Sequence, residues 1–219
     1  YVAERLGYAP WLDEFRTYLG DPRLTLEEFF VRYTLMRRGE GVKMDTVQGE
    51  KQALDFYAAS EYPLWRQVVH RRHSAWRRVL WTMNGKHGRL LELGCGIAPV
   101  SAWVNRFRPG WTFGLHDLIY SPHYKYGNWR LRGRQCCFGY WHVTTALDFF
   151  EHLSDPRAAA ERAVKGMAAG GYLHFNFVET DARGLDLASP AQRAETIAYL
   201  RSALTVVYEE DGYVVCRKR

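Results

Sequence analysis

The first 83 residues carry apolar side chains at helical spacing. Trp11, Phe15 and Tyr18 recur every three to four positions, as expected of an amphipathic helix. Thr25-Leu-Glu-Glu28, ahead of two phenylalanines, has the form of a capping box and predicts the start of a second helix. The chain therefore opens with a helical region.

Glycine and proline divide this helical region further. Gly39-Glu-Gly41 interrupts the apolar pattern, and we expect a helix to end there. A helix is expected to restart near Thr46 and again at Pro63, because proline suits the first turn of a helix. Three or four helices are predicted before residue 84.

From Gly88 the pattern changes, because short apolar runs rich in β-branched and aromatic residues alternate with helical stretches. This alternation is typical of βαβ units around a largely parallel sheet. We expect strands at residues 89–93, 111–116, 142–147 and 172–178, with a weaker one at 135–138, and helices at 98–107, 122–132 and 156–168. Residues 204–209 and 213–218 flank Asp211-Gly212, which predicts a final antiparallel hairpin.

The composition is that of a globular protein, with 47% hydrophobic and 25% charged residues. The four cysteines, at positions 95, 136, 137 and 216, show no C-x-x-C spacing, so a reducing cytoplasm fits them better than a secreted disulfide framework. No run approaches the ~20 apolar residues that cross a bilayer. We therefore expect a cytoplasmic location and no membrane partner.

The most informative motif follows the strand expected at 89–93. Leu90-Leu-Glu-Leu-Gly-Cys-Gly96 places two glycines between a buried strand and a helix, where the backbone turns tightly and a ligand can approach closely. Downstream, Asp117 closes the next strand, where a ribose-binding acid would stand. Taken alone, the two glycines are more typical of a plain strand-to-helix turn than of a ligand site.

The order of motifs over residues 88–219 resembles that of class I S-adenosylmethionine-dependent methyltransferases. Glu92-x-Gly94-x-Gly96 is similar to their first motif, Asp117 to the second-strand acid, residues 146–155 to the motif after the fourth strand, and Gly170-Gly171 to the turn into the fifth. Pro99 replaces the third glycine of G-x-G-x-x-G, which argues against a nicotinamide dehydrogenase. The resemblance implies an α/β, Rossmann-like fold with a mostly parallel seven-stranded sheet, an antiparallel C-terminal hairpin and a preceding helical segment.

The resemblance also implies how S-adenosylmethionine would bind. The backbone at Gly94 and Gly96 would face its methionine portion, Asp117 would accept hydrogen bonds from the ribose hydroxyls, and Glu92 would orient the loop or a water. His116 is interpreted as a strand-end histidine that bonds to the backbone and does not contact the cofactor. The expected cofactor-binding residues are Glu92, Gly94, Cys95, Gly96, Asp117, Leu118 and Asp148.

Asp148, Glu151 and His152 form a D-x-x-E-H pattern after the fourth strand. His152 is the candidate general base, since its ordinary pKa lies near neutrality, and Glu151 is the second catalytic candidate. A similar spacing in the ubiquinone-pathway O-methyltransferases implies a divalent metal. The competing interpretation is a helix cap beside the cofactor, and we assign no metal.

Residues 62–83 mix Trp65, Trp76 and Trp81 with several arginines, and much of the net charge of +6 lies there. Such a segment could stack bases and bind phosphates, which would indicate an RNA-directed enzyme. The apolar spacing instead favours an amphipathic helix that packs on the domain and leaves its arginines in solvent.

We expect a small-molecule acceptor with an O or N nucleophile, bound by a methyltransferase domain at 84–219 under a helical cap at 1–83. RNA or protein methylation and a non-catalytic partner-binding subunit are the alternatives, and nucleic-acid binding and homo-oligomerisation stay open. Helices ahead of the first strand commonly form the acceptor wall in this family. The acceptor-binding candidates are Tyr57, Tyr62, Trp65, Tyr120 and Tyr124.

Overall fold

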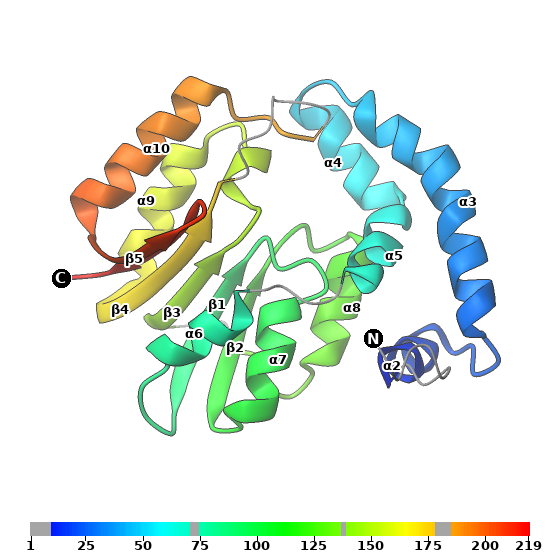
Figure 1. The fold of residues 1–219 in the computed structure, drawn as a ribbon, viewed down its shortest axis with the longest axis horizontal. Coiled ribbons are helices and arrows are strands. Elements are labelled where there is room, and N and C mark those ends of the chain that lie inside the picture. Colours follow the sequence, from blue (N-terminus) through cyan, green and yellow to red (C-terminus); the bar gives the residue numbers. More distant parts are fainter. Residues whose placement is uncertain (1–9, 71–74, 137–138, 178–184) are drawn as a thin grey trace.

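A computed structural model of the chain describes residues 10–70, 75–136, 139–177 and 185–219 (Figure 1). Helices precede a mixed sheet, whose strands then alternate with helices up to a final hairpin. In chain order the elements are α2 Pro10–Leu19, α3 Leu26–Asp45, α4 Gly49–Ala59, α5 Tyr62–Val69, α6 Trp76–Thr82, β1 Gly88–Leu93, α7 Pro99–Phe107, β2 Trp111–His116, α8 Pro122–Arg130, β3 Trp141–Ala146, η1 Phe150–His152, α9 Pro156–Gly166, β4 Met167–Asn176, α10 Pro190–Ala203, β5 Thr205–Glu210 and β6 Tyr213–Arg217.

The sheet has the strand order β2-β1-β3-β4-β6-β5. The first four strands in this order pair in parallel, and β6 runs antiparallel to both β4 and β5. The turn between β5 and β6 has positive φ at both Asp211 (50°) and Gly212 (75°), as a two-residue hairpin with the twist of its strands requires. The predicted α/β fold and its antiparallel end are confirmed.

The predicted seventh strand is wrong for the described part of the chain, where the sheet has six strands. In its place, Gln135 forms an isolated parallel bridge with Phe113 of β2. The Phe113 N–H donates to the Arg134 carbonyl, and its carbonyl accepts from Cys136 N–H, both at 2.9 Å. Only ten residues separate the end of α8 from Trp141, and a turn at Gly133 (φ 79°) uses part of them. Too little chain remains for a full edge strand.

The N-terminal helices follow most of the sequence signals. The capping box is present, since Thr25 accepts from Glu28 N–H and Glu28 accepts from Thr25 N–H. The expected break at Gly39-Glu-Gly41 is wrong, because α3 continues through it to Asp45. A helical glycine costs only about 1 kcal/mol relative to alanine, which the rest of a long helix can offset. None of the helices within the described ranges is long and apolar enough to span a bilayer.

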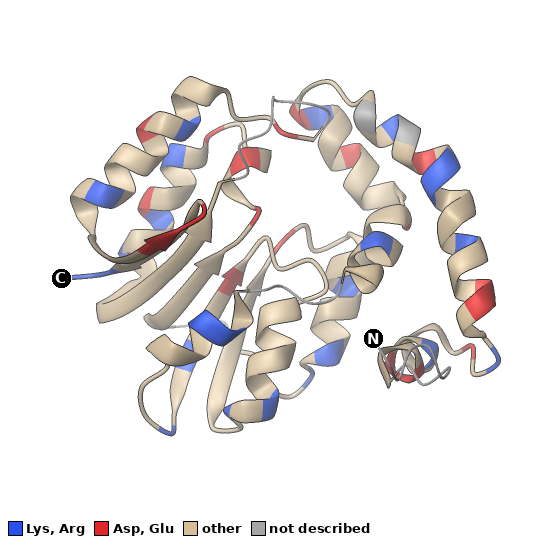
Figure 2. Cartoon of the chain, viewed as in Figure 1, with Lys and Arg blue, Asp and Glu red and all other residues tan. Residues whose placement is uncertain are grey.

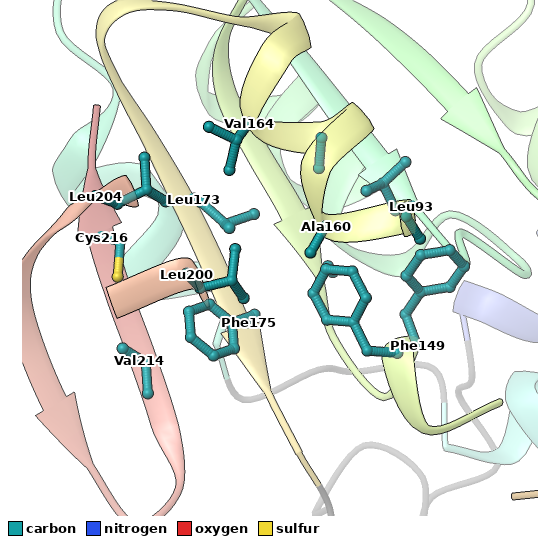
Figure 3. Close-up of a cluster of buried hydrophobic side chains, with 14 of the residues drawn as sticks. Leu93, Phe149, Ala160, Val164, Leu173, Phe175, Leu200, Leu204, Val214 and Cys216 are labelled. Atoms are coloured by element: carbon teal, nitrogen blue, oxygen red, sulfur yellow. The ribbon is translucent and has the colours of Figure 1, made fainter. Parts of the chain in front are cut away.

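Two hydrophobic cores hold the sheet between its helices. On one face, α9 and α10 pack on Leu173 and Phe175 of β4 and on Val214 and Cys216 of β6 (Figure 3). On the other face, α6 and α7 pack on residues of β1, β2, β3 and β6. Helix α6 therefore belongs structurally to the sheet, although it lies within the segment expected to be a separate cap.

A third core joins α2, α3 and α5 to α8, and these helices flank the sheet on one side in Figure 1. Its centre is aromatic, with Phe15, Phe29 and Trp65 in mutual edge or stacked contact. Ile97, from the loop after β1, is also a buried member of this core. The helical cap and the glycine-containing loop are thus packed as one unit.

Candidate functional site

The loop after β1 has the tight geometry that its glycines predict. Gly94 and Gly96 have φ of 61° and 48°, in the left-handed region that favours glycine. A Cβ on Gly94 would lie 2.5 Å from the Phe149 ring, and a Cβ on Gly96 would lie 2.0 Å from Gln67 Oε1. Neither position accommodates another residue without displacing a neighbour.

Glu92 anchors the helix that follows this loop. Its carboxylate oxygens accept hydrogen bonds from the N–H groups of Val100 (3.1 Å) and Ser101 (2.8 Å), in the first turn of α7. Glu92 is buried, so these bonds satisfy helix-terminal donors that water does not reach. Glu92 therefore holds the first turn of α7, directly after the loop.

Asp117, directly after β2, is bonded to the same loop. Its Oδ2 accepts from Gly96 N–H at 2.7 Å, and its Oδ1 accepts from Leu118 N–H at 2.7 Å and lies 3.3 Å from His123 Nε2. Burial raises the pKa of this carboxyl, but His123 and the two N–H donors outweigh burial, and the pKa lies below its usual value. Asp117 is therefore an ionised acceptor at the carboxyl end of the sheet.

The peptide group of Ile97 is held from both sides. Its N–H donates to Gln67 Oε1 of α5 (2.9 Å), and its carbonyl accepts from Arg130 Nη1 of α8 (2.7 Å). Arg130 also pairs with Glu14 of α2 at 2.8 Å. Two cap helices thus contact the loop, one directly through Gln67 and one through Arg130.

Asp148, two residues after the end of β3, has a left-handed conformation with φ of 48°. The side chain of Asn176, at the end of the neighbouring β4, bonds both to its N–H and to its carboxylate. Figure 2 shows that acidic residues recur on the loops at this edge of the sheet, on the side of α4 and α5.

Glu151 and His152 lie in the short helix η1, beside the loop that ends at α10. Glu151 is 1% exposed, and its Oε2 has no hydrogen-bond partner among the described residues. Burial raises the pKa of the Glu151 carboxyl above its usual value, and Asp148 and Asp186 add to the effect.

His152 is oriented by that same loop. Its Nδ1 lies 3.0 Å from Asp186 Oδ1 and 3.2 Å from the Leu185 carbonyl, and Asp186 also pairs with Arg193 at 3.6 Å. Burial lowers the pKa of His152, but the hydrogen bond and charge of Asp186, with Glu151, raise it above its usual value. Across the described ranges, no three His, Cys, Asp or Glu side chains are placed to hold a metal ion.

Tyr57 of α4 is the candidate acceptor residue that reaches this edge. Its ring meets the His123 ring at 5.5 Å in an edge contact. Burial raises the pKa of its hydroxyl, and the charges of Asp117, Asp186 and Glu151 raise it further. The charge of Arg66 lowers this pKa but does not offset the increase.

The other acceptor candidates differ in burial and in the element that carries them. Tyr62 and Trp65 are buried, Tyr62 stacked on Tyr33 and Trp65 inside the aromatic core of the cap, so their apolar rings stabilise the cap. Tyr120 is 74% exposed on the loop before α8, and Tyr124 is half-buried on α8. Cys95 is buried, and burial raises its thiol pKa well above the usual value.

Four residues of the site carried no signal in the sequence: Gln67, His123, Asn176 and Asp186. Each acts on a partner from another element, and none belongs to a local motif. The expected strand at 135–138 lies partly outside the described residues, and residues 178–184 lie wholly outside them.

No protein-family model matches the chain, and no curated protein matches its sequence. Among solved structures, the chain is similar to the N-methyltransferase NodS from Bradyrhizobium japonicum WM9 in complex with S-adenosyl-L-homocysteine, with a TM-score of 0.54 and 18% identity over 76% of this chain and 97% of that one. It is also similar to an O-methyltransferase family 2 protein from Planctomyces limnophilus, with a TM-score of 0.54 and 15% identity over 76% of this chain and 65% of that one. The similarity to the [4+2]-cyclase SpnF has a TM-score of 0.53 and 15% identity over 76% of each chain.

These likenesses show the fold, which is that of the class I S-adenosylmethionine-dependent methyltransferases. SpnF is described as a cyclase, so a chain with this fold need not catalyse methyl transfer.

Proposed function

We propose that the protein is a methyltransferase that uses S-adenosylmethionine to methylate a small-molecule acceptor. The observation that carries the proposal is the ionised, partly buried Asp117 directly after β2, hydrogen-bonded to the backbone of the glycine loop at Gly96. An acid in this position fits ribose hydroxyls, because a carboxylate accepts strong, charge-assisted hydrogen bonds from them.

The residues around the loop fit the rest of this cofactor. Gly94 and Gly96 bring bare backbone to the carboxyl edge of the sheet, where the amino-acid portion would lie. Gln67 and Phe149 contact the two glycines and therefore border the same place. Leu118 and Cys95 flank the acid and the loop, and Asp148, fixed by Asn176, would face the cofactor from β3. Glu92 would act by holding α7 in position.

When bound, S-adenosylmethionine would supply an electrophilic methyl group, so the chain has chiefly to align a nucleophile and exclude water. We assign His152 the role of general base, because Asp186 and the Leu185 carbonyl hold its Nδ1 and direct its Nε2 to the opposite side. Nε2 would take the proton from the acceptor's O–H or N–H group. Glu151 would support the charged imidazole, and Tyr57 would line the acceptor side from the cap.

A small-molecule acceptor is favoured over RNA by the contacts of the basic aromatic segment. Trp65 is buried in the cap core, and Trp76 stacks on Trp103 with ring centroids 4.8 Å apart. Arg78 pairs with Glu210 and lies over the rings of Tyr208 and Tyr213. These side chains stabilise the fold: the buried and stacked tryptophans fit the amphipathic interpretation, whereas Arg78 is paired and not left in solvent. Trp81 is the strongly exposed tryptophan of the described segment.

The test is transfer of a radiolabelled methyl group from S-adenosylmethionine into a metabolite extract, with protein and RNA fractions assayed in parallel. Label in the small-molecule fraction, reduced at least tenfold by His152→Ala, is the expected result. Label confined to RNA or protein would overturn the acceptor class. Cofactor binding without transfer to any fraction would favour the partner-binding subunit.

A further inference from the structure

His123 occupies a buried position directly behind Asp117. It lies in the first turn of α8, is 2% exposed, and its Nε2 is 3.3 Å from Asp117 Oδ1 and 3.1 Å from Ser121 Oγ. The sequence showed no reason to single it out. On the opposite side, the edge contact with Tyr57 holds the ring.

The chemistry of the contact fixes the proton on Nε2. Asp117 is ionised and can only accept, so a stable contact at this distance requires an N–H on Nε2. Ser121 Oγ, 3.1 Å from Nε2, accepts from Tyr124 N–H and has a second lone pair with which it shares the Nε2 proton with Asp117. His123 Nδ1 is buried and has no hydrogen-bond partner among the described residues. Within the described residues, the hydrogen bonds of the imidazole therefore all involve Nε2, and Asp117 is the charged partner.

The three donors on Asp117 restrict how its carboxylate can be used. Gly96 N–H takes one site on Oδ2, while Leu118 N–H and His123 Nε2–H both lie on Oδ1. A carboxylate oxygen has two lone-pair directions, so Oδ1 is filled and Oδ2 retains one free site. Without His123, one lone pair of Oδ1 would lose its donor, and only the two backbone N–H groups would hold the carboxylate.

We propose that His123 is a positioning residue for ribose recognition: it fixes the Asp117 carboxylate so that Oδ2 presents its free lone pair to a ribose hydroxyl. This inference rests on the proposed cofactor site. His123 acts through Asp117 and need not touch the cofactor. It also connects the acceptor side of the cap, at Tyr57, to the cofactor acid.

Two substitutions separate the hydrogen bond from the ring. His123→Phe keeps an aromatic ring against Tyr57 and removes the donor, whereas His123→Gln keeps an N–H at a similar reach. Calorimetric titration would use two probes, S-adenosylhomocysteine and its 2′,3′-dideoxy analogue, with thermal unfolding of each variant as a folding check. The preference of the protein for the first probe over the second measures recognition of the ribose hydroxyls.

Wild-type protein is expected to bind S-adenosylhomocysteine more tightly than the dideoxy analogue. The ratio of the two affinities should be about tenfold smaller in His123→Phe and close to the wild-type ratio in His123→Gln. An unchanged preference in His123→Phe would overturn the inference, even if both affinities fell together, because that pattern indicates a general structural effect. Wild-type protein that binds S-adenosylhomocysteine without preference would also overturn it. Failure of wild-type protein to bind either probe would instead remove the proposed function on which the inference rests.

Discussion

The side-chain amide of Asn176 makes two hydrogen bonds to Asp148. Its Oδ1 accepts from Asp148 N–H at 2.8 Å, and its Nδ2 donates to Asp148 Oδ1 at 2.5 Å. These bonds join the carboxyl ends of β3 and β4. They also hold Asp148 in a left-handed conformation that non-glycine residues adopt at a cost of about 1 kcal/mol.

Asn176→Ala is therefore expected to destabilise the fold by about 1 kcal/mol and to weaken cofactor binding more than that stability loss implies. The stability cost is modest because Asp148 is exposed to water, which replaces part of the lost bonding. Urea unfolding and calorimetry with S-adenosylhomocysteine would measure the two effects. Asp148→Asn, which tolerates the same backbone conformation without the charge, is the matched variant. Unchanged affinity in both would remove Asp148 from the cofactor site.

Gly96→Ala should destabilise the protein by at least ~2 kcal/mol, since the new methyl group would collide with Gln67 and the residue has positive φ. Adding Gln67→Ala removes the collision but leaves the backbone strain. The double variant should accordingly be less destabilised than the sum of the single variants, by about 1–2 kcal/mol in a double-mutant cycle. Simple additivity would mean that Gln67 does not lie over the loop in solution.

Glu92→Gln should cost about 2 kcal/mol of unfolding free energy, because both carboxylate oxygens accept from buried N–H groups of α7. The amide NH₂ of glutamine would face one of those donors. Glu27→Gln provides the control, because Glu27 lies in the first turn of α3 but is exposed, and its loss should cost under about 0.5 kcal/mol. Equal, small effects in urea unfolding would contradict the anchoring role of Glu92.

His174 should make the fold sensitive to acid. It is fully buried between Thr82 and Tyr213, and burial lowers its pKa to about 3. An unfolded histidine titrates near 6.5, so between these values the unfolded chain binds the extra proton and stability falls as the pH falls.

The loss attributable to His174 should reach about 2 kcal/mol between pH 6.5 and pH 5, at ~1.4 kcal/mol per unit. Unfolding free energies of wild type and His174→Gln at several pH values would measure it. The variant should be less stable at neutral pH but show a shallower slope below pH 6.5. Parallel slopes would show that another group causes the acid sensitivity.

Much of the fold could be predicted because its determinants are local. The strand at 111–116 was placed at its observed bounds, and the hairpin turn at Asp211-Gly212 follows from two residues that accept positive φ. The break expected at Gly39-Glu-Gly41 failed because packing along a long helix overrides the propensity of two residues. The third strand failed because the chain between Arg130 and Trp141 is too short to pair fully along β2.

The residues of the candidate site also differ in whether the local sequence marks them. The glycine loop and Asp117 could be found because strand ends and turn residues mark them along the chain. Gln67, His123 and Asp186 could not, because each contact crosses between elements that only the tertiary fold brings together. Trp65 was assigned to the acceptor wall because a helical pattern identifies an apolar face without saying what that face packs against.

The central claim is a cofactor site built from the glycine loop and Asp117, and calorimetric titration with S-adenosylhomocysteine tests it most directly. Wild-type protein should bind at one saturable site, and Asp117→Asn should weaken binding at least tenfold, because the amide offers a donor where the hydroxyl and Gly96 N–H both require an acceptor. Absence of saturable binding at millimolar ligand, or equal affinity in the variant, would contradict the account.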